Sequence, residues 1–573
     1  MAEWKPTQAF AATFVDELSR CGLAAVCIAP GSRSAPLAMA FARHPGVRVW
    51  MHLDERSASF FALGMAKTAE LPVAILCTSG TAAAELHAAV IEAYHSRTPL
   101  LVLTADRPPE LREVGANQAI DQLRLFGGAV RWAFDPGVPD AEPEAPQRWR
   151  RLAARALAEA AGPPAGPVHL NLPFREPLTP EPGQAPEAVP ACGPPARVRS
   201  GARPPDEALA AELAGRLAAA RRPLVVAGEM RDGARLREPL DDLLRRVDAP
   251  LLAEPTSHLR TSGAVGVVEP YDALLRDAAW ANAHRPDLVL RLGAPPTSKA
   301  LSQLVARSGG ALVVVDADGW RDPEQAAQEF VRCDPAALLP AVTARLPAAG
   351  PMPWRREWAA AGTAASAALD RCLGRSPLHE GPVVRALAAA LPEGAHVLVG
   401  SSMPIRDVDT FWPAALPGQR FLANRGASGI DGLVSTGLGM AAAAGGPAVL
   451  LVGDLTLYHD MNGLWAIRRH GLRVVIVVLD NDGGGIFGFL PQAAHPDVFE
   501  ELFGTPLGLR LEDVARLYDL GFIPVDAVAD LGPALSAALA GERSVMVSVR
   551  FDRQASVAGH RACWAAVAEA LRG

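Results

Sequence analysis

The sequence predicts an α/β protein made of three doubly wound parallel-sheet domains, and three observations support this fold class. Short apolar, β-branched runs alternate with Ala/Leu-rich helical stretches along the chain, which is the pattern of parallel βαβ units. Polar turns follow these runs, as they do at the carboxyl ends of strands. At 573 residues the chain is too long for one core and has room for about three or four ordinary domains.

The first domain is predicted over residues 1–180. Its expected strands are Ala24–Ala29, Val47–Leu53, Val73–Cys77 and Leu100–Thr104. Each strand leads into a polar turn and then a helix, and the turns are 31–34, 54–56, 79–81 and 106–108. Open α/β sheets bind ligands at this edge, so these turns are candidate binding segments.

A Pro-rich linker is predicted over residues 181–206, because the stretch Pro177–Pro205 holds nine prolines and has no helical or strand periodicity. A central α/β domain follows over 207–350, and a third over 351–573. The expected strands of these two domains are Leu224–Ala227, Pro250–Ala253, Leu288–Leu292, Leu312–Asp316, Val397–Val399, Arg420–Ala423, Val449–Val452, Val474–Leu479 and Val545–Val549.

Composition excludes several classes of function. The net charge of −7 argues against a nucleic-acid or anionic-membrane surface, since both need a basic face. No apolar run approaches the ~20 residues of a membrane helix, and no secretory signal opens the chain. The seven cysteines are scattered without a C-x-x-C pair, so a zinc site is not expected. Free thiols of this kind predict a protein of the reducing cytoplasm.

Two strand-end turns of the third domain form a candidate magnesium site. One strand runs into Gly453-Asp454-Leu455, and the next runs into Asp480-Asn481-Asp482-Gly483, with Asn481 27 residues after Asp454. That spacing fits one strand–helix–strand crossover, so the turns should lie on adjacent strand ends. A carboxylate, an amide oxygen and a backbone carbonyl then offer the hard oxygens that Mg²⁺ prefers beside a diphosphate. Taken alone, each turn fits an ordinary strand-to-helix turn as well as it fits a metal site.

The pair of turns resembles the thiamine-diphosphate fingerprint, Gly-Asp-Gly followed by a double Asn. It departs from the fingerprint at Leu455, which replaces the second Gly, and at Asp480, which replaces the first Asn. This cofactor also needs a shielded carboxyl group on its aminopyrimidine ring, and Glu55 is the candidate. The alternative for Glu55 is a residue that only places favourable charge at a helix N-terminus.

Longer motifs resemble the family of 2-succinyl-5-enolpyruvyl-6-hydroxy-3-cyclohexene-1-carboxylate (SEPHCHC) synthases, which are thiamine-diphosphate enzymes with three α/β domains. The motifs are 29–37 (APGSRSAPL), 52–56 (HLDER), 78–82 (TSGTA), 104–109 (TADRPP), 115–118 (GANQ), 400–406 (GSSMPIR), 424–432 (NRGASGIDG) and 453–455 (GDL). The first and third domains carry nearly all of them.

The resemblance implies a transferase of menaquinone biosynthesis. It would decarboxylate 2-oxoglutarate on thiamine diphosphate and add the succinyl carbanion equivalent to isochorismate, with Mg²⁺, for which Mn²⁺ can substitute. Both substrates are dicarboxylates, which arginine binds better than lysine. The substrate-binding residues implied are Ser32, Arg33, Arg107, Asn117, Gln118, Lys299, Ser402, Arg406 and Arg425.

The resemblance also assigns the remaining roles. Glu55 and Gln118 would be catalytic. The cofactor would contact Glu55, Ser402, Ile430, Gly453, Asp454, Leu455 and Asn481, and the metal would be held by Asp454, Asn481 and the carbonyl of Gly483. For each of the implied substrate-binding residues, Lys299 included, the alternative is a solvated turn residue or a surface ion pair, and for Ile430 it is a core isoleucine. Active sites would lie between the chains of a cytoplasmic homodimer or homotetramer.

Two rival functions stay open. One is another thiamine enzyme, either an acetohydroxyacid-synthase-like carboligase or a 2-oxo-acid decarboxylase. The other is a dinucleotide- or flavin-binding protein, because 437–442 (GLGMAA) matches G-x-G-x-x-A. No buried strand precedes Gly437 and no acidic strand end follows at the required distance, so close helix packing is the favoured interpretation of that segment.

Overall fold

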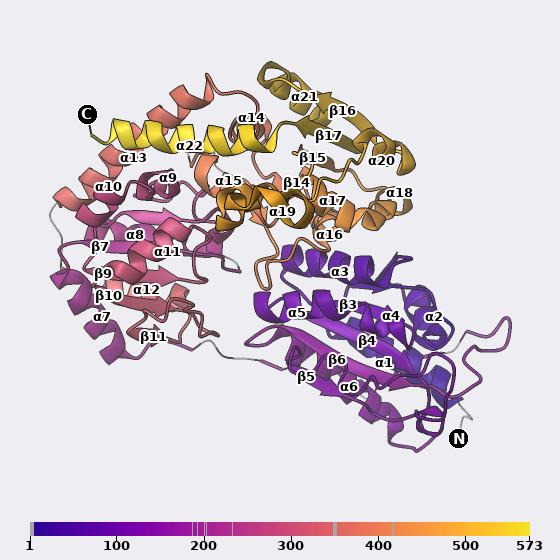
Figure 1. Cartoon of the computed structure of the whole chain (residues 1–573). Coiled ribbons are helices and arrows are strands. Elements are labelled where there is room, and N and C mark those ends of the chain that lie inside the picture. The colour runs from indigo at the N-terminus through magenta and orange to yellow at the C-terminus, as the bar shows by residue number, and fades with distance from the viewer. Residues whose placement is uncertain are drawn as a thin grey trace. The chain divides into compact units, whose positions relative to one another are not determined.

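The computed structural model describes residues 5–572 apart from 186, 192, 197, 200, 202, 232, 348–351 and 415–417. These residues form three parallel sheets of six, five and six strands, which confirms the predicted fold class (Figure 1). The chain divides into two compact units. The first comprises 1–200, 424–445 and 456–473, and the second comprises 201–423, 446–455 and 474–573. The predicted domain limits stay predictions.

The first unit holds a sheet of strand order β2-β1-β3-β4-β6-β5. Its strands are β1 (Ala25–Ile28), β2 (Arg48–Met51), β3 (Val73–Cys77), β4 (Leu100–Asp106), β5 (Trp132–Phe134) and β6 (Pro167–Pro173). Its helices are α1 (Pro6–Arg20), α2 (Ala35–Arg43), α3 (Glu55–Ala69), α4 (Thr81–Ala84), α5 (His87–Ser96), α6 (Ala145–Ala161), α16 (Leu433–Ala443) and α18 (Trp465–His470). Helices α3 and α5 cover one face of the sheet, and α1 and α6 pack together on the other (Figure 1).

Helices α3 and α16 of this unit pack backbone against backbone. A Cβ on Gly64 would stand 1.9 Å from the carbonyl oxygen of Thr436, and a Cβ on Gly439 would stand 2.0 Å from that of Phe61. Gly439 belongs to the G-x-G-x-x-A segment, which therefore lies inside a helix and serves close helix packing. The helix against which α16 packs is α3, which covers the first sheet.

The second unit holds the other two sheets. The central one has the order β11-β10-β9-β7-β8. Its strands are β7 (Pro223–Ala227), β8 (Leu251–Ala253), β9 (Leu288–Leu292), β10 (Ala311–Val315) and β11 (Glu329–Val331). Its helices are α7 (Glu207–Ala219), α8 (Arg237–Val247), α9 (Tyr271–Leu275), α10 (Ala278–Ala283), α11 (Lys299–Arg307) and α12 (Pro335–Thr343).

The third sheet has the order β13-β12-β14-β15-β17-β16. Its strands are β12 (His396–Val399), β13 (Arg420–Leu422), β14 (Ala448–Gly453), β15 (Val475–Asp480), β16 (Gly521–Val525) and β17 (Val545–Arg550). The helices around it are α13 (Pro353–Leu373), α14 (Glu380–Ala390), α15 (Met403–Phe411), α19 (Pro496–Phe499), α20 (Leu511–Leu517), α21 (Val528–Ala540) and α22 (Arg553–Ala570). Helix α17 (Asp454–His459) follows β14 and begins in the second unit but continues into the first.

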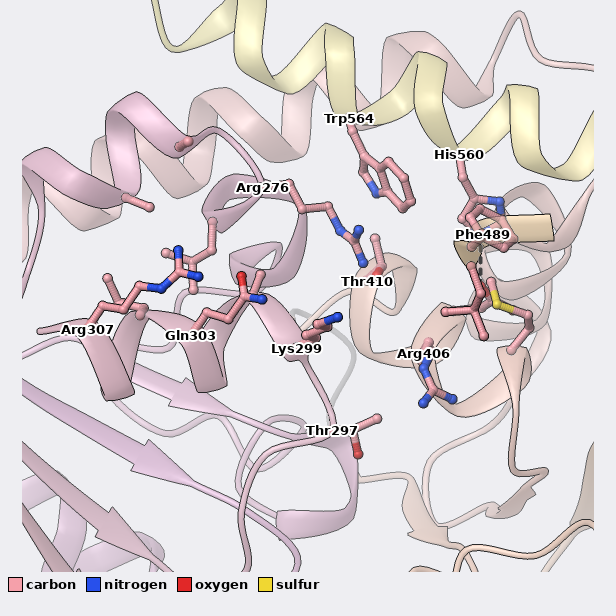
Figure 2. Close-up of a pocket in the computed structure, with 18 of the residues that line it drawn as sticks. Arg276, Thr297, Lys299, Gln303, Arg307, Arg406, Thr410, Phe489, His560 and Trp564 are labelled. Carbon is pink, nitrogen blue, oxygen red and sulfur yellow. Dashed lines mark hydrogen bonds and ion pairs between the residues drawn. The ribbon is translucent and has the colours of Figure 1, made fainter. Parts of the chain in front are cut away.

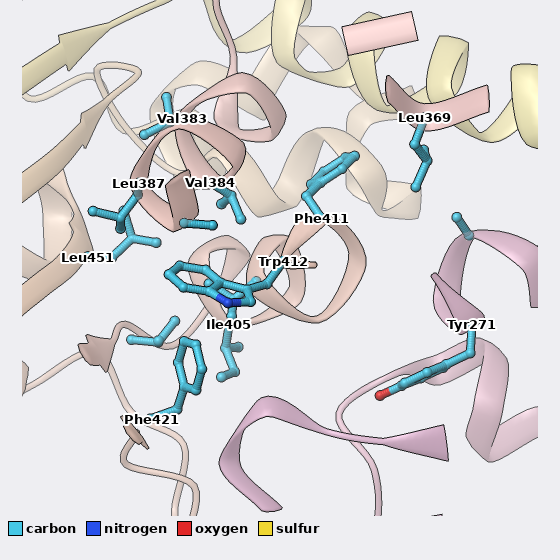
Figure 3. Close-up of a cluster of buried hydrophobic side chains, with 14 of the residues drawn as sticks. Tyr271, Leu369, Val383, Val384, Leu387, Ile405, Phe411, Trp412, Phe421 and Leu451 are labelled. Atoms are coloured by element: carbon cyan, nitrogen blue, oxygen red, sulfur yellow. The ribbon is translucent and has the colours of Figure 1, made fainter. Parts of the chain in front are cut away.

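One hydrophobic core runs through the second unit. It includes Val289 of the central sheet and Val397 of the third sheet, both fully buried. Figure 3 shows part of it, where the α15 side chains Ile405 and Phe411 pack near Val384 of α14. Because strands buried on both faces need apolar side chains throughout, these sequences read as continuous apolar runs. The shared core holds the two sheets of this unit together.

Candidate active site

The two predicted magnesium turns meet in the structure. Strands β14 and β15 are neighbours, with Gly453 opposite Leu479 in the register. The turns that follow them are joined by a hydrogen bond, which the Gly483 backbone N–H donates to the Asp454 carboxylate at 2.7 Å. Asp454 is buried, with 3% of its surface exposed. The crossover inferred from the spacing of the two turns is confirmed.

The oxygen atoms at this place fit a hard divalent cation. The side-chain oxygen of Asn481 is buried and has no hydrogen-bond partner among the described residues, which is costly unless a ligand satisfies it. Burial raises the pKa of Asp454 to about 6, and the charges of Asp480 and Asp482 add to the effect. A bound cation would satisfy the Asn481 oxygen and favour the charged form of Asp454. The carbonyl of Gly483 accepts one N–H, from Gly485 at 3.0 Å, and keeps a second lone pair.

Space for a diphosphate lies beside these oxygens. No described atom comes within 4 Å of the position that a Cβ on Gly453 would take. The strand order of this sheet reverses between β12 and β14, and α/β sheets bind ligands at such switch points. Ser402 follows β12 and Asp454 follows β14, so two predicted residues flank the switch point. Ser402 has a φ of +71°, a strained value that is typical of functional sites.

Asp480, the departure from the double Asn, faces a different neighbour. It stands opposite Arg550 in the β15–β17 register, and both line a cavity of about 350 Å³. Burial raises the pKa of Asp480, while the charge of Arg550 lowers it. The extra carboxylate is therefore partly balanced by an arginine.

Glu55 is the first residue of α3, and Asp54 before it supplies the helix cap by accepting the Ser57 N–H at 3.0 Å. Glu55 is half-buried. Its pKa is raised by burial and, to a smaller extent, by the charges of Asp54 and Glu85. A carboxyl group that holds its proton more tightly than usual is what the aminopyrimidine partner requires. Because Asp54 already caps the helix, the capping role does not need Glu55.

Arg33 and Arg107 are brought together at the carboxyl edge of the first sheet. Arg33 is buried and donates to the carbonyl oxygen of Phe174 at 2.9 Å. Arg107 donates to the hydroxyl of Ser79. The pKa of Arg107 is lowered by burial and by the charge of Arg33, so the two guanidinium groups lie within range of each other's charge. Ser32 precedes Arg33 in the same turn.

Gln118 lies over the turn that follows β3. Its backbone has a φ of +54° and lies 3.4 Å from the position of a Cβ on Gly80. Asn117 precedes it on the same exposed loop. Sequence reasoning missed the residue that organises this corner: Gln122 is buried, accepts the Gly80 N–H at 2.9 Å and donates to Asn171 at 2.9 Å. A Gln among loop residues carries no signal that separates it from a solvated one.

Arg425 and Ile430 lie on the 424–445 segment of the first unit. The loop that carries Arg425 is fixed by Glu92, whose carboxylate accepts the backbone N–H groups of Gly426 and Ala427 at 3.0 and 2.6 Å. Ile430 is half-buried and therefore is not a fully enclosed core residue.

Lys299 and Arg406 line one basic pocket of the second unit, with a volume of about 730 Å³ (Figure 2). Lys299 opens α11 after strand β9, and Arg406 lies on α15 and donates to the Ser402 carbonyl oxygen. The basic residues of the lining are Arg276, Arg285, Lys299, Arg307, Arg406 and His560. Asp407 is the one carboxylate among the described lining residues. Such a pocket is suited to an anion.

A buried polar cluster behind this pocket escaped sequence reasoning. His560 of α22 hydrogen-bonds to Asp407 through Nε2 at 2.9 Å and to the carbonyl oxygen of Ser556 through Nδ1 at 2.9 Å. A carbonyl oxygen and an ionised carboxylate are both acceptors, which favours a proton on each ring nitrogen. Ser556 also donates to Glu380 at 2.6 Å. His379 is nearby, but its Nδ1 accepts the Gly381 N–H, so its proton sits on Nε2 and that atom is not a ready metal ligand.

Two family models match the chain. The model described as thiamine pyrophosphate enzyme, N-terminal TPP binding domain, matches residues 8–125, and the one described as the C-terminal TPP binding domain matches 409–549. The first range contains Glu55 and Arg107, and the second contains Asp454 and Asn481. Both predicted halves of the cofactor site therefore fall within matches to thiamine pyrophosphate enzyme domains.

Curated relatives align with nearly the whole chain. A 2-succinyl-5-enolpyruvyl-6-hydroxy-3-cyclohexene-1-carboxylate synthase from Geobacillus kaustophilus is 46% identical over 98% of this chain and 98% of its own. Synthases of the same name from Chloroflexus aurantiacus and Rubrobacter xylanophilus are 43% and 42% identical, each over 98% of this chain and over 96% and 97% of their own. The chain belongs to the SEPHCHC synthase family.

A solved structure supports the fold of this SEPHCHC synthase family member. The benzoylformate decarboxylase of Polynucleobacter necessarius aligns with a TM-score of 0.71 and 19% identity over 95% of this chain and 99% of its own. At that identity the likeness speaks for the three-domain architecture alone. No helix in the described part of the chain is long and apolar enough to cross a membrane.

Proposed function

We propose that this chain joins 2-oxoglutarate to isochorismate with loss of CO₂ and so forms SEPHCHC for menaquinone biosynthesis. The product is the compound in the name of the relatives, which align over nearly the full chain. Thiamine diphosphate and Mg²⁺ are the proposed cofactors. When bound, thiamine diphosphate would supply a nucleophilic carbon that adds to the 2-oxo group and an electron sink for the pair left by CO₂.

Asp454, Asn481 and the carbonyl of Gly483 are the proposed magnesium ligands. The partnerless oxygen of Asn481 and the raised pKa of Asp454 support this assignment. Gly453 and Leu455 would lie along the diphosphate. Three protein oxygens leave octahedral positions open for phosphate oxygens and water, which is how proteins usually hold magnesium.

Glu55 is the proposed acid–base partner of the aminopyrimidine ring. Its half-buried carboxyl group, with a raised pKa, would hold a proton at the oxygen that faces the ring. Gln118 would assist proton handling as a neutral donor, and Ile430 would support the bent cofactor. Glu55 lies in the first unit and Asp454 in the second, and the proposed site takes Glu55 from one chain and Asp454 from its partner.

The basic residues divide between the two substrates. Both substrates are dianions, and the observation that carries the proposal is the basic pocket with Lys299 and Arg406 on its walls. Ile486 and Phe489 line the same pocket and follow the magnesium turn in the chain. An acceptor bound there would lie next to the cofactor, and Lys299, Ser402 and Arg406 would hold it.

The arginines of the first unit complete the proposed set of substrate contacts. Arg33 and Arg107 are adjacent and would bind a carboxylate in a fork, with Ser32 and Asn117 as neutral donors. Arg425 would join them from its Glu92-held loop. The proposed assembly is a homodimer or homotetramer in the cytoplasm, with active sites between chains.

The deciding experiment is a product assay with isochorismate, 2-oxoglutarate, thiamine diphosphate and Mg²⁺. Loss of isochorismate that depends on 2-oxoglutarate supports the proposal. Equal or faster turnover of pyruvate alone would establish the rival carboligase or decarboxylase. Calorimetry with thiamine diphosphate against NAD and FAD tests the cofactor class, and light scattering tests the oligomer.

A further inference from the structure

Asp272 is a buried carboxylate that joins three distant segments of the second unit. It is the second residue of α9 and only 3% exposed. One of its oxygens accepts the Ser298 hydroxyl at 2.6 Å. The other accepts Nε of Arg276 at 2.9 Å and the Thr410 hydroxyl at 3.0 Å. A single side chain therefore fixes α9, the start of α11 and the C-terminal end of α15 relative to one another.

Two of these hydrogen-bond donors adjoin a cation of the basic pocket. Ser298 is the N-cap of α11, where its hydroxyl accepts the Leu301 N–H at 3.2 Å, and Lys299 is the next residue. Thr410 lies one helical turn after Arg406 on α15. The bonds to Asp272 thus set the distance between the start of α11, which carries Lys299, and the C-terminal end of α15, one turn after Arg406.

Arg276, the third donor, is itself a cation of the pocket, and two contacts fix the orientation of its guanidinium group. Its guanidinium carbon stacks 3.8 Å from the centre of the Trp564 ring, which sets the plane of the group. The hydrogen bond from Nε to Asp272 sets its rotation within that plane. Figure 2 shows the guanidinium group between Trp564 and Thr410, facing the cavity.

We propose that Asp272 is a positioning residue for binding of the acceptor. It holds the central-domain cations Lys299 and Arg276 in a fixed arrangement with Arg406 of the third domain. This inference rests on the proposed function, which places a dicarboxylate acceptor in the pocket. Two carboxylates at a fixed separation need cations at a matching separation, and a shift of about 1 Å can cost up to about 100-fold in rate. The central domain then has a direct part in substrate recognition.

The test is the variant Asp272→Asn in the full-length holoenzyme. Asparagine keeps the volume and one accepting oxygen, but its NH₂ group cannot accept the bonds of Arg276 and Thr410. We expect the KM for isochorismate to rise about tenfold, the scale of one lost charge-assisted hydrogen bond. The KM for 2-oxoglutarate, and its decarboxylation without isochorismate, followed with a dye oxidant, should change less than about twofold.

Single-bond variants and a matched control separate positioning from general loosening. Thr410→Val removes one bond to Asp272 and should give part of the rise in the KM for isochorismate. Ser298→Ala removes a second bond to Asp272 together with the cap of α11 and should also raise this KM. Asp277→Asn is the control, because Asp277 caps α10 through the Trp280 N–H at 2.8 Å and does not line the pocket. Equal rises in the KM for both substrates, or the same rise in Asp277→Asn, would overturn the proposal.

Activity of the unmodified protein distinguishes failure of the proposed function from failure of the positioning role of Asp272. If the parent does not consume isochorismate, the proposed function fails, and positioning is tested by crystal structures of the parent and Asp272→Asn. Movement of Arg276 off Trp564 together with a changed Lys299–Arg406 separation supports Asp272 as the positioning residue. Unchanged placement of all three cations overturns it.

Discussion

The Asp454 carboxylate and the Gly483 backbone N–H are hydrogen-bonded at 2.7 Å, so the two turns of the metal site are tied directly to each other. The other oxygen of Asp454 accepts the Leu455 N–H at 2.8 Å. These bonds fix the carboxylate in place. Gly483 is needed here for a second reason, since its φ is +136° and a Cβ would meet the Gly504 carbonyl oxygen at 1.9 Å. The site is therefore organised by the backbone of the chain itself.

Replacement of Asp454 should weaken cofactor binding itself. Asp454→Ala removes the only charged ligand of the proposed set, and loss of even an outer partner of a metal costs about 10- to 100-fold in affinity. We expect the Mg²⁺-dependent affinity for thiamine diphosphate, measured by calorimetry, to fall at least 100-fold.

Asp480→Asn is the matched control for that measurement. Asp480 carries the same charge on the neighbouring turn but stands opposite Arg550. Its cofactor affinity should stay within about threefold of the parent, as expected for a charge outside the ligand set. An unchanged affinity in Asp454→Ala would rule out Asp454 as a ligand.

Glu55→Gln should separate cofactor binding from turnover. Glutamine preserves the size of the side chain but cannot exchange the proton that the aminopyrimidine ring requires. Because acid–base partners contribute about 10² to 10⁴ in rate, we expect turnover to fall at least 100-fold while calorimetric cofactor affinity stays near that of the parent. Near-normal turnover would refute this role for Glu55.

Arg406→Lys should impair acceptor binding although the charge is kept. Lysine is a point charge and cannot make the paired hydrogen bonds of a guanidinium group. Arg406 also donates to the Ser402 carbonyl oxygen at the start of its own helix, a contact that orients it. We expect the KM for isochorismate to rise about tenfold in steady-state assays. Arg307→Lys, at the other end of α11 from Lys299, is the comparison variant and should change this KM much less.

Sequence periodicity was sufficient to predict most of the buried strands but missed several others. Strands β3 and β9 have the predicted bounds, Val73–Cys77 and Leu288–Leu292. The missed strands include β16 (Gly521–Val525), which holds both a Gly and a Pro and pairs only with β17 in the sheet order. Strand β6 (Pro167–Pro173) lies inside the sheet but begins and ends with proline. In both, tertiary pairing overrides weak local preference.

The residues of the candidate site also divide into those that the sequence predicts and those that it does not. Asp454 and Asn481 could be paired from sequence because strand-end turns one crossover apart must meet at one sheet edge. The Asp272 and His560 contacts could not be predicted, since hydrogen bonds between helices far apart in the chain leave no periodic signal. Both are buried polar residues on helices, where the sequence pattern alone does not distinguish a partnered residue from a solvated one.

His560 links this buried network to pH. Burial lowers its pKa, but the hydrogen bond and charge of Asp407 and the charge of Glu380 outweigh burial and raise it to about 9. The rings of Phe489 and Trp564 also face it. A folded-state pKa above the unfolded value of about 6.5 stabilises the protein fully below pH ~6.5, and this contribution is lost as pH rises through 9.

The variant His560→Gln tests this dependence. Glutamine can keep a donor to Asp407 but carries no charge, so it lacks the pH-dependent contribution. We expect the parent to exceed the variant in the free energy of unfolding by up to about 3 kcal/mol near pH 6, with the difference shrinking toward pH 9. Thermal melting of both proteins across this range measures the difference. A constant gap would mean that His560 does not change its protonation there, and a gap that widens with pH would mean that His560 is neutral in the folded chain.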